Sequence, residues 1–457
     1  MRRTRGGAES ALGEARRKLS SILIVGGGVS GLVCAWRLAR AGHDVEVLER
    51  EQTPGGRMRS EVHGDFVLER GAQFVTSGYR NLHGVAGALG LGDRIRPLPL
   101  SNNAVAWEGK LYPADSLLGM LGSPLLSSGR KLGLGKLALE LFRHRSLLDP
   151  LQPERASSLD RQDAASYLAN TVGVDARDRL LGPLISGTFD CELEDLSAAF
   201  LLLVLRQALA GPKLQSIEGG LGEFTQALAW EVPVRLGCDV RCILSETDGA
   251  RVRYESGGRE HTAVADAVVV AIPGPLVPGL CPKLTPIERG FFESVDYVRG
   301  TIVHLLLEKP IPDLEYFGVS FPRAENSDLY ALCVDQHRVG AAPPGAGLIN
   351  VALTEEAALR TWDAPESAVI EMVLDSLLRA PIGLLSPAQA VVHRWPLMLP
   401  RLGTGSLIRL SSFLRRNDRS PRLSFAGDYL IGPNLEAAVT SGMRAASDVA
   451  RSLDIAR

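Results

Sequence analysis

The chain has 457 residues and 45% of them are hydrophobic, so it can bury a sizeable core and build two or three domains of roughly 100–200 residues each. Its 50 basic and 52 acidic residues give a net charge of −2, which argues against a nucleic-acid-binding protein because such proteins carry a basic surplus. The six cysteines are scattered, and Cys238 and Cys242 have no matching second pair, so we expect reduced thiols, no metal site and a cytoplasmic location.

The first 20 residues carry a cluster of arginines and lack the apolar core of a secretory signal, so they are typical of a flexible basic tail. Further along, we find no segment with the roughly 20 consecutive apolar residues that span a bilayer. The longest apolar run, residues 198–205, has the length of a buried helix or strand.

A strand, a helix and a second strand follow the tail. Residues 22–25 form a β-branched and leucine run that is typical of a buried parallel strand. Apolar positions at helical spacing continue to Ala39, and Gly42 is placed to end that helix. Residues 45–48 form a second apolar run. This order predicts the first unit of a parallel α/β sheet.

The turn between the first strand and the helix has the pattern G-x-G-x-x-G. Gly26 permits a tight turn, Gly28 lets a pyrophosphate approach the backbone, and Gly31 allows the helix to pack closely on the sheet. Glu49 ends the second strand, where a carboxylate can accept hydrogen bonds from a ribose, so we expect a dinucleotide without a 2′-phosphate. The expected contacts in this unit are Gly26, Gly28, Ser30, Gly31, Glu49 and Arg50.

The next segment, residues 51–60, contains Gly55, Gly56 and Arg57 in the order Gly-Gly-Arg. Here the chain resembles the flavin-containing amine oxidase superfamily, in which a similar segment follows the second strand. The resemblance implies that the dinucleotide is FAD and that these three residues wrap its pyrophosphate. The residue types suit that role, because glycines admit a phosphate to the backbone and a guanidinium neutralises it.

Two further segments resemble parts of the FAD site in the same superfamily. Residues 66–74 resemble a run that passes beside the flavin ring, so Gly71, Ala72 and Gln73 are candidates for that wall. Residues 237–240 resemble the strand whose backbone meets the adenine, which makes Val240 a candidate.

The carboxyl-terminal part resembles the closing FAD segment of the superfamily. Residues 423–426 read as a strand, and the resemblance implies that Asp428 then holds the ribityl or phosphate region. The resemblance also implies that a helix starting near residue 434 points its N-terminus at the flavin N1–C2=O edge, where its dipole would stabilise the reduced form. No cysteine lies in residues 427–446, so we expect noncovalent FAD. The implied contacts are Gly427, Asp428, Asn434, Leu435 and Ala438.

Motifs of this kind occur near residues 21–75, 219–273 and 423–446, which predicts a composite site interrupted by insertions. The expected fold is α/β, with a composite Rossmann-type FAD-binding domain, an inserted α+β substrate domain and a helical segment. The expected boundaries are 1–20 for the tail, 21–95, 219–285 and 400–457 for the FAD-binding domain, 96–218 for a helical insertion at the substrate mouth, and 286–399 for the substrate-binding domain.

Between these motifs, the order of segments resembles protoporphyrinogen oxidases more than the amine oxidases proper. A predicted hairpin of strands 104–107 and 110–112 precedes an apolar segment, 115–136, that contains several basic residues. Residues 187–197 and the His-Arg-Trp-Pro run at 393–396 also resemble that family. The apolar segment is either a face that contacts a membrane or a helix packed on its own domain.

One strand position separates the two families. Many amine oxidases place a lysine about four residues after a glycine, where it holds a water at flavin N5. Here Gly300 is followed at that spacing by His304, which counts against a standard amine oxidase. His304 is either a proton acceptor near pH 7 or a half-buried strand histidine. Trp395 is either a cage wall beside the flavin or a core aromatic.

A second departure concerns substrate binding. Some protoporphyrinogen oxidases anchor a propionate through an arginine just after the hairpin, but residues 113–118 contain none. Arg299 and Arg394 are the candidates to replace it.

Three functions remain open from the sequence. The first is an FAD-dependent oxidase that converts a porphyrinogen to a porphyrin, with O2 or another acceptor regenerating FAD. The second is an oxidase or desaturase of the same superfamily that acts on an amine or a natural-product intermediate. The third is a flavin-bound protein without turnover. The first two imply a small-molecule substrate, and none implies nucleic acid.

Overall fold

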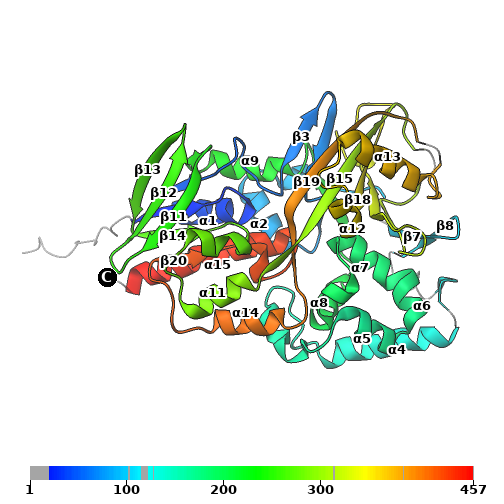
Figure 1. The fold of residues 1–457 in the computed structure, drawn as a ribbon, viewed down its shortest axis with the longest axis horizontal. Coiled ribbons are helices and arrows are strands. Elements are labelled where there is room, and N and C mark those ends of the chain that lie inside the picture. Colours follow the sequence, from blue (N-terminus) through cyan, green and yellow to red (C-terminus); the bar gives the residue numbers. More distant parts are fainter. Residues whose placement is uncertain are drawn as a thin grey trace, which may run out of the picture.

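The computed structural model describes residues 20–100, 103–114, 122–126, 128–311, 314–383 and 385–455. Its first layer is a parallel sheet in the order β10-β2-β1-β14-β20. Three distant parts of the chain supply these strands, and Figure 1 shows blue, green and red segments together in this part of the molecule. The strands are β1 (Ser21–Val25), β2 (Asp44–Leu48), β10 (Val234–Arg235), β14 (Ala267–Val270) and β20 (Leu423–Phe425).

Both faces of this sheet are buried, because alternate residues of β1 pack into two different hydrophobic cores. Ile22 and Ile24 pack with the helices, whereas Leu23 and Val25 face the three-stranded sheet β11-β12-β13. The predicted α/β class and the strand–glycine–helix–strand unit are therefore confirmed. The covering elements are α1 (Val29–Arg40), α2 (Arg80–Ala88), α9 (Gly222–Trp230), α15 (Leu435–Ile455), β11 (Asp239–Ser245), β12 (Ala250–Ser256) and β13 (Arg259–Ala265).

Glycines allow the helix–sheet contact at the first turn. Gly26 has a φ of 109°, and a β-carbon on it would lie 2.4 Å from the Ala271 carbonyl oxygen. A β-carbon on Gly31 would lie 2.0 Å from the Gly26 carbonyl oxygen. Any side chain at either position would force α1 away from the sheet, as the glycine pattern predicts.

A second, seven-stranded sheet has the order β19-β15-β18-β17-β16-β7-β8. The predicted hairpin is confirmed as β7 and β8, at one edge. Helices α12 (Glu355–Arg360) and α13 (Glu366–Leu377) cover one face through a core that includes Val303, Leu305 and Val351. The strands are β7 (Asn103–Trp107), β8 (Lys110–Pro113), β15 (Asp296–Leu307), β16 (Gly318–Ser320), β17 (Leu329–Val334), β18 (Gly347–Leu353) and β19 (Pro387–Arg401).

A helical layer lies below this sheet in Figure 1 and has an apolar core of its own. Its helix α7 (Gly182–Phe189) packs against the face opposite α12 and α13, because a β-carbon on Gly187 would contact Ser320 and Ala331. The run at 198–205 is helical. The other helices of the layer are α4 (Ser128–Arg143), α5 (Ala164–Thr171), α6 (Val174–Ala176) and α8 (Ala198–Ala208).

Residues 115–121 and 127 of the predicted apolar segment lie outside the described residues. Within the part of the chain that the structure describes, none of the helices has the length and apolar character needed to cross a bilayer.

Candidate functional site

Two glycine turns form a cradle at the N-terminus of α1. A β-carbon on Gly28 would meet no protein atom within 4 Å, and α1 has no acidic residue in its first turn. The Gly55 N–H donates to the Gly27 carbonyl oxygen at 2.8 Å. A β-carbon on Gly56, which has a φ of 56°, would lie 3.3 Å from the Gly28 Cα. The cradle therefore fits a diphosphate held by backbone N–H groups and the helix dipole.

The carboxylate of Glu49 lies beside this cradle. It accepts hydrogen bonds from the Gly27 N–H at 2.6 Å and the Glu51 N–H at 2.8 Å, so it is fixed next to the glycine turn. The carbonyl oxygen of Glu49 accepts from the Cys238 N–H at 2.8 Å, which places the segment leading to buried Val240 alongside. This arrangement fits the ribose and adenine end of a dinucleotide. Arg50, by contrast, is exposed, and among the described residues its ion-pair partner is its neighbour Glu51.

Arg57 and Asp428 form a bidentate ion pair, although 371 positions separate them in sequence. The Nη1–Oδ2 and Nη2–Oδ1 distances are 2.8 and 2.9 Å. Arg57 also donates to the Met398 carbonyl oxygen at 2.8 Å, and the Tyr297 hydroxyl donates to Asp428 Oδ1 at 3.2 Å. Although burial alone would lower it, Asp428 raises the pKa of Arg57 above its ordinary value. The pair closes one side of the cradle and presents fixed polar groups there.

The predicted flavin wall starts directly behind Arg57. The Ala72 N–H donates to the Arg57 carbonyl oxygen at 2.9 Å, and a β-carbon on Gly71 would lie 2.4 Å from that same oxygen. Trp395 on β19 donates its indole N–H to the Arg70 carbonyl oxygen at 2.6 Å. The structure therefore brings residues 57, 71, 72 and 395 together, and only glycine fits at position 71.

Helix α15 reaches this region with its N-terminus. Asn434 caps the helix by accepting the Ala437 N–H at 2.9 Å, as an N-cap residue does. Glu436 points away and accepts the N–H groups of Asn81 and Leu82 at the start of α2. Leu435 and Ala438 keep part of their surface exposed. The one carboxylate in the first turn of α15, Glu436, is thus taken up by the N–H groups of α2, and the dipole of α15 suits an anionic flavin edge.

A buried polar network continues from the wall into the seven-stranded sheet. Gln73 Oε1 accepts from Asn350 Nδ2 at 2.9 Å and from Arg338 Nη2 at 3.2 Å. Arg338 also contacts Asp335 at 2.7 Å and Glu69 at 3.6 Å. Burial raises the pKa of Glu69 and of Asp335, although Arg338 opposes the shift in both. The network fixes Gln73 against the sheet.

His304 lies on this same face of the sheet. It is fully buried on β15, opposite Asn350, and its ring centroid lies 5.2 Å from that of His393 on β19. Neither ring nitrogen of His304 makes a hydrogen bond of normal geometry to the described residues. Burial and the neighbouring His393 lower the pKa of His304 well below its ordinary value, and burial lowers that of His393 to about 4. Both rings are therefore neutral at pH 7.

Arg299 and Arg394 do not join this group. Arg299 lies over the ring of Trp362, and Arg394 donates to the Ala364 carbonyl oxygen at 2.7 Å. Trp362 and Ala364 belong to the segment between α12 and α13, so the arginines point to the face opposite His304. The two arginines and His304 point to opposite faces because successive residues of a strand face opposite sides of a sheet.

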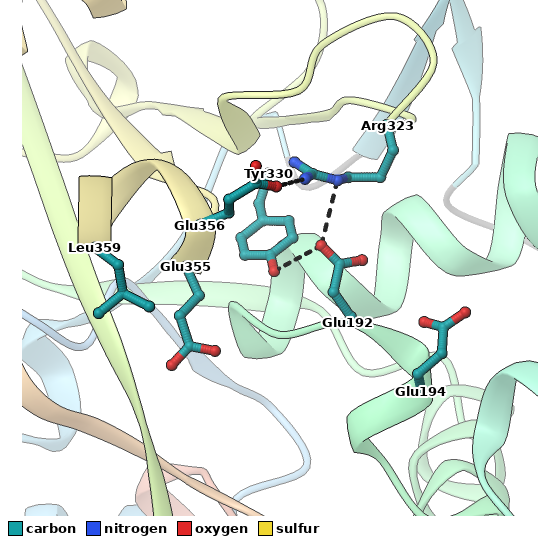
Figure 2. A pocket seen from close by; sticks show the side chains of 7 residues that line it. All are labelled: Glu192, Glu194, Arg323, Tyr330, Glu355, Glu356 and Leu359. Carbon is teal, nitrogen blue, oxygen red and sulfur yellow. Dashed lines mark hydrogen bonds and ion pairs between the residues drawn. The ribbon is translucent and has the colours of Figure 1, made fainter. Parts of the chain in front are cut away.

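A cavity of about 470 Å³ opens elsewhere, between the helical layer and α12 (Figure 2). Its charged lining consists of four glutamates and Arg323, and Glu192 bridges Arg323 and the Tyr330 hydroxyl. None of the predicted cofactor residues lines it, so we do not place the cofactor there. Its lining residues are Glu192, Glu194, Arg323, Tyr330, Glu355, Glu356 and Leu359.

Sequence reasoning missed several residues of the site. Tyr297 and the Met398 carbonyl hold the Arg57–Asp428 pair. Arg338 and Asn350 hold Gln73, and Asp335 holds these two in turn. Among the residues around the site, His393 was the one that a sequence pattern could point to, because it lies in the His-Arg-Trp run. The other residues are ordinary strand or turn positions whose roles depend on tertiary contacts.

Comparison with known proteins gives a consistent result. The family model described as flavin containing amine oxidoreductase matches residues 29–450. Coproporphyrinogen III oxidase of Mycobacterium tuberculosis is 24% identical over 95% of this chain and 98% of its own length. Mitochondrial protoporphyrinogen oxidase of Nicotiana tabacum is 26% identical over 42% of this chain and 36% of its own. The solved structure of cyclohexylamine oxidase from Brevibacterium oxydans shares the fold, with a TM-score of 0.77 at 19% identity, covering 95% of this chain and 99% of that one.

Proposed function

Since this chain belongs to the family of flavin-containing amine oxidoreductases, we propose that it is an FAD-dependent oxidase whose substrate is a porphyrinogen. The observation that carries the substrate class is the similarity to coproporphyrinogen III oxidase, because it extends over nearly the whole of both chains. His304, which stands where many amine oxidases have a lysine, adds support. It is buried and neutral, so it cannot supply the positive charge of that lysine.

We assign residues 21–95, 219–285 and 400–457 to FAD binding and residues 286–399 to substrate binding. In this assignment Gly28, Gly55 and Gly56 hold the pyrophosphate, which binds without a covalent bond to the protein. Glu49 orients the ribose, and the Arg57–Asp428 pair fixes the middle of the cofactor. When bound, FAD accepts a hydride from a carbon of the substrate and passes the electrons to O2 or another acceptor.

The sheet face with His304, Asn350 and Gln73 then positions the substrate, and it excludes water because its side chains are buried or half-buried. Oxidation of a porphyrinogen needs no strong acid from the protein, only a fixed orientation of the carbon that loses hydride. This fits a site whose histidines stay neutral at pH 7.

Two exposed apolar side chains support a peripheral membrane contact at the helical layer. Leu139 and Phe142 on α4 are 63% and 64% exposed, and Arg145 stacks on the Phe142 ring. An apolar pair with a basic neighbour suits the interface of an anionic bilayer. Flotation with vesicles containing anionic lipid tests this contact, and Leu139→Ser with Phe142→Ser should reduce binding.

The second candidate is an oxidase of amines or natural-product intermediates. It is favoured by the absence of an arginine in residues 113–118, since that leaves no propionate anchor at the hairpin. A flavin-bound protein without turnover is a third alternative.

The deciding experiment mixes purified holoenzyme, in air, with coproporphyrinogen III or protoporphyrinogen IX and follows porphyrin fluorescence against a control without enzyme. We expect a catalysed rise with at least one substrate, and the faster one identifies the porphyrinogen. A flat trace with both, from protein that visibly carries flavin, would overturn the porphyrinogen assignment. The same preparation is then screened with amines, where turnover would establish the second candidate.

A further inference from the structure

Asp190, at the end of α7, is a buried residue whose carboxylate has no partner among the residues that the structure describes. The residue has 8% of its surface exposed to solvent. Among the described residues, no hydrogen bond or ion pair is made by its side chain. Buried carboxylates are nearly always paired, because an unpaired buried charge is costly. The part of the chain that the structure describes therefore leaves the place beside this carboxylate open to a partner.

The backbone at Asp190 is also held in an unusual conformation. Asp190 has φ and ψ of 52° and 37°, in the left-handed region, where it ends the helix α7. Glycine is the residue that usually takes this position, since it has no β-carbon to strain the backbone. Aspartate is one of the few other residues that tolerate this conformation, so the backbone accounts for the residue type at this position but not for the unpaired carboxylate.

The carboxylate lies over the sheet face that carries His304. Helix α7 packs on that face at Ser320 and Ala331, and Asp190 is close enough to Cys333 to shift the pKa of its thiol. Cys333 stands opposite Asn350 on the next strand, and Asn350 stands opposite His304 on the one after. Neighbouring strands are about 4.8 Å apart, so Cys333 and His304 are separated by about 10 Å.

The titratable groups that face Asp190 from its surroundings are the thiols of Cys191 and Cys333, and Asp335 and Arg338 lie beyond Cys333. Burial raises the pKa of both thiols, so they stay protonated and cannot neutralise a carboxylate. Cys333 keeps part of its surface exposed although β17 is an inner strand, so the space above it is not filled by protein.

We propose that Asp190 is a substrate-binding residue whose carboxylate accepts hydrogen bonds from N–H groups of the substrate. The inference rests on the proposed function and deepens it, because it names the part of the substrate that this site recognises. Both candidate substrate classes offer such donors, namely the pyrrole N–H groups of a tetrapyrrole and the N–H groups of a protonated amine. A charge-assisted hydrogen bond from either donor would stabilise the buried carboxylate.

Two substitutions separate binding from folding. Asp190→Asn keeps the size and removes the charge, and asparagine tolerates the left-handed conformation. Asp190→Gly removes the side chain, and glycine adopts the left-handed conformation readily. Neither should lower the melting temperature. Glu194→Gln is the matched control, because it removes one negative charge from an exposed residue four positions further along the chain.

The experiment titrates each holoenzyme, without oxygen, with coproporphyrin III, protoporphyrin IX and cyclohexylammonium, and follows flavin absorbance and protein fluorescence. We expect the Asp190 variants to bind at least one of these probes about tenfold or more weakly than the wild type, as the loss of a charge-assisted hydrogen bond predicts. The Glu194→Gln control should bind like the wild type. Loss with the porphyrins identifies pyrrole N–H groups, and loss with cyclohexylammonium identifies an ammonium.

The pH dependence is a second readout. Burial raises the pKa of Asp190 to about 7, so cyclohexylammonium affinity should rise between about pH 6 and pH 8 in the wild type and stay flat in Asp190→Asn. If every probe that binds the wild type binds the Asp190 variants equally well, Asp190 does not bind substrate and the proposed function stands. If no probe binds the wild-type holoenzyme, the proposed function and this inference both fail.

Discussion

Gly442 of α15 packs directly against Ser30 of α1, because a β-carbon at position 442 would lie 2.3 Å from the Ser30 carbonyl oxygen. The Ser30 hydroxyl donates to the Ala438 carbonyl oxygen at 2.9 Å across the same interface. At Gly442, therefore, the helix α15 near the end of the chain packs against the helix α1 near its beginning. The contact places the start of α1 and the start of α15 around one cofactor site.

Gly442→Ala should therefore destabilise the protein and lower its flavin content, because the helices must move apart. We expect a loss of about 1–3 kcal/mol in the free energy of unfolding, the usual range for overpacking, measured by denaturant titration. Gly290→Ala on the helix α11 (Pro286–Glu293) is the control. A β-carbon there meets nothing within 4 Å, so this change should be neutral or stabilise by about 0.5–1 kcal/mol.

Gly28→Val should separate cofactor binding from folding. The backbone at Gly28 is extended and a β-carbon there meets no protein atom within 4 Å, so the apoprotein accommodates the change. A bound pyrophosphate would collide with the new side chain. Thermal unfolding of the apoprotein should stay near that of the wild type, while flavin absorbance of the purified protein should fall severalfold.

Gly31→Ala is the contrasting variant, since its β-carbon would strike the Gly26 carbonyl oxygen, and it should lose stability together with flavin. Full flavin occupancy in Gly28→Val would move the pyrophosphate site away from this turn.

Arg57→Met should be strongly destabilising because it leaves Asp428, which is 5% exposed, without its cation. Breaking a buried ion pair from one side typically costs about 3–5 kcal/mol, and the partial exposure of Arg57 places the effect toward the lower end. Adding Asp428→Leu should recover part of the loss. A double-mutant cycle on unfolding free energies measures the coupling, and additive losses would show that the two residues act independently.

His304→Gln tests whether this buried histidine takes part in proton transfer. If His304 is a positioned proton acceptor, kcat should fall by about 100-fold or more. Its pKa lies well below the ordinary value, so the pH–rate profile between about pH 6 and pH 8 should have the same shape in wild type and variant. An inflection that disappears in His304→Gln would mean that the ring titrates in this range.

Much of the fold was predictable because local signals determine it. The turn at Gly26, Gly28 and Gly31 is specified by steric limits that only glycine meets, and the strands on either side are uninterrupted apolar runs. The hairpin of β7 and β8 follows from two short strands with a glycine turn. These features depend on residues close in sequence.

The rest depends on contacts between distant residues. The Arg57–Asp428 pair joins positions 371 apart, and the sequence predicted a cofactor contact for each residue but not the ion pair between them. Arg299 and Arg394 were predicted from charge alone, but strand alternation turns both to the face of Trp362 and Ala364. Asp190 gave no signal, because its unpaired state is visible only once α7 is packed on the sheet.

Asp190→Asn should stabilise the substrate-free protein, and more so at high pH. The unfolded chain ionises Asp190 near its ordinary pKa of 3.8, whereas burial raises the folded-state pKa to about 7. Between these values the folded state holds a proton that the unfolded state has released, so wild-type stability falls as pH rises through this window. The penalty is absent below about pH 4 and complete above about pH 7, where three pKa units amount to about 4 kcal/mol at most.

Unfolding free energies of wild type and Asp190→Asn, measured by denaturant titration from about pH 4 to pH 8, check this linkage. The two proteins should be equally stable at the acidic end, and the variant should gain steadily up to neutrality. Glu194→Gln should show no such trend, because Glu194 is exposed. A constant difference across the range would mean that the Asp190 carboxyl titrates normally and is solvated or paired, which would remove the reason for a ligand at this position.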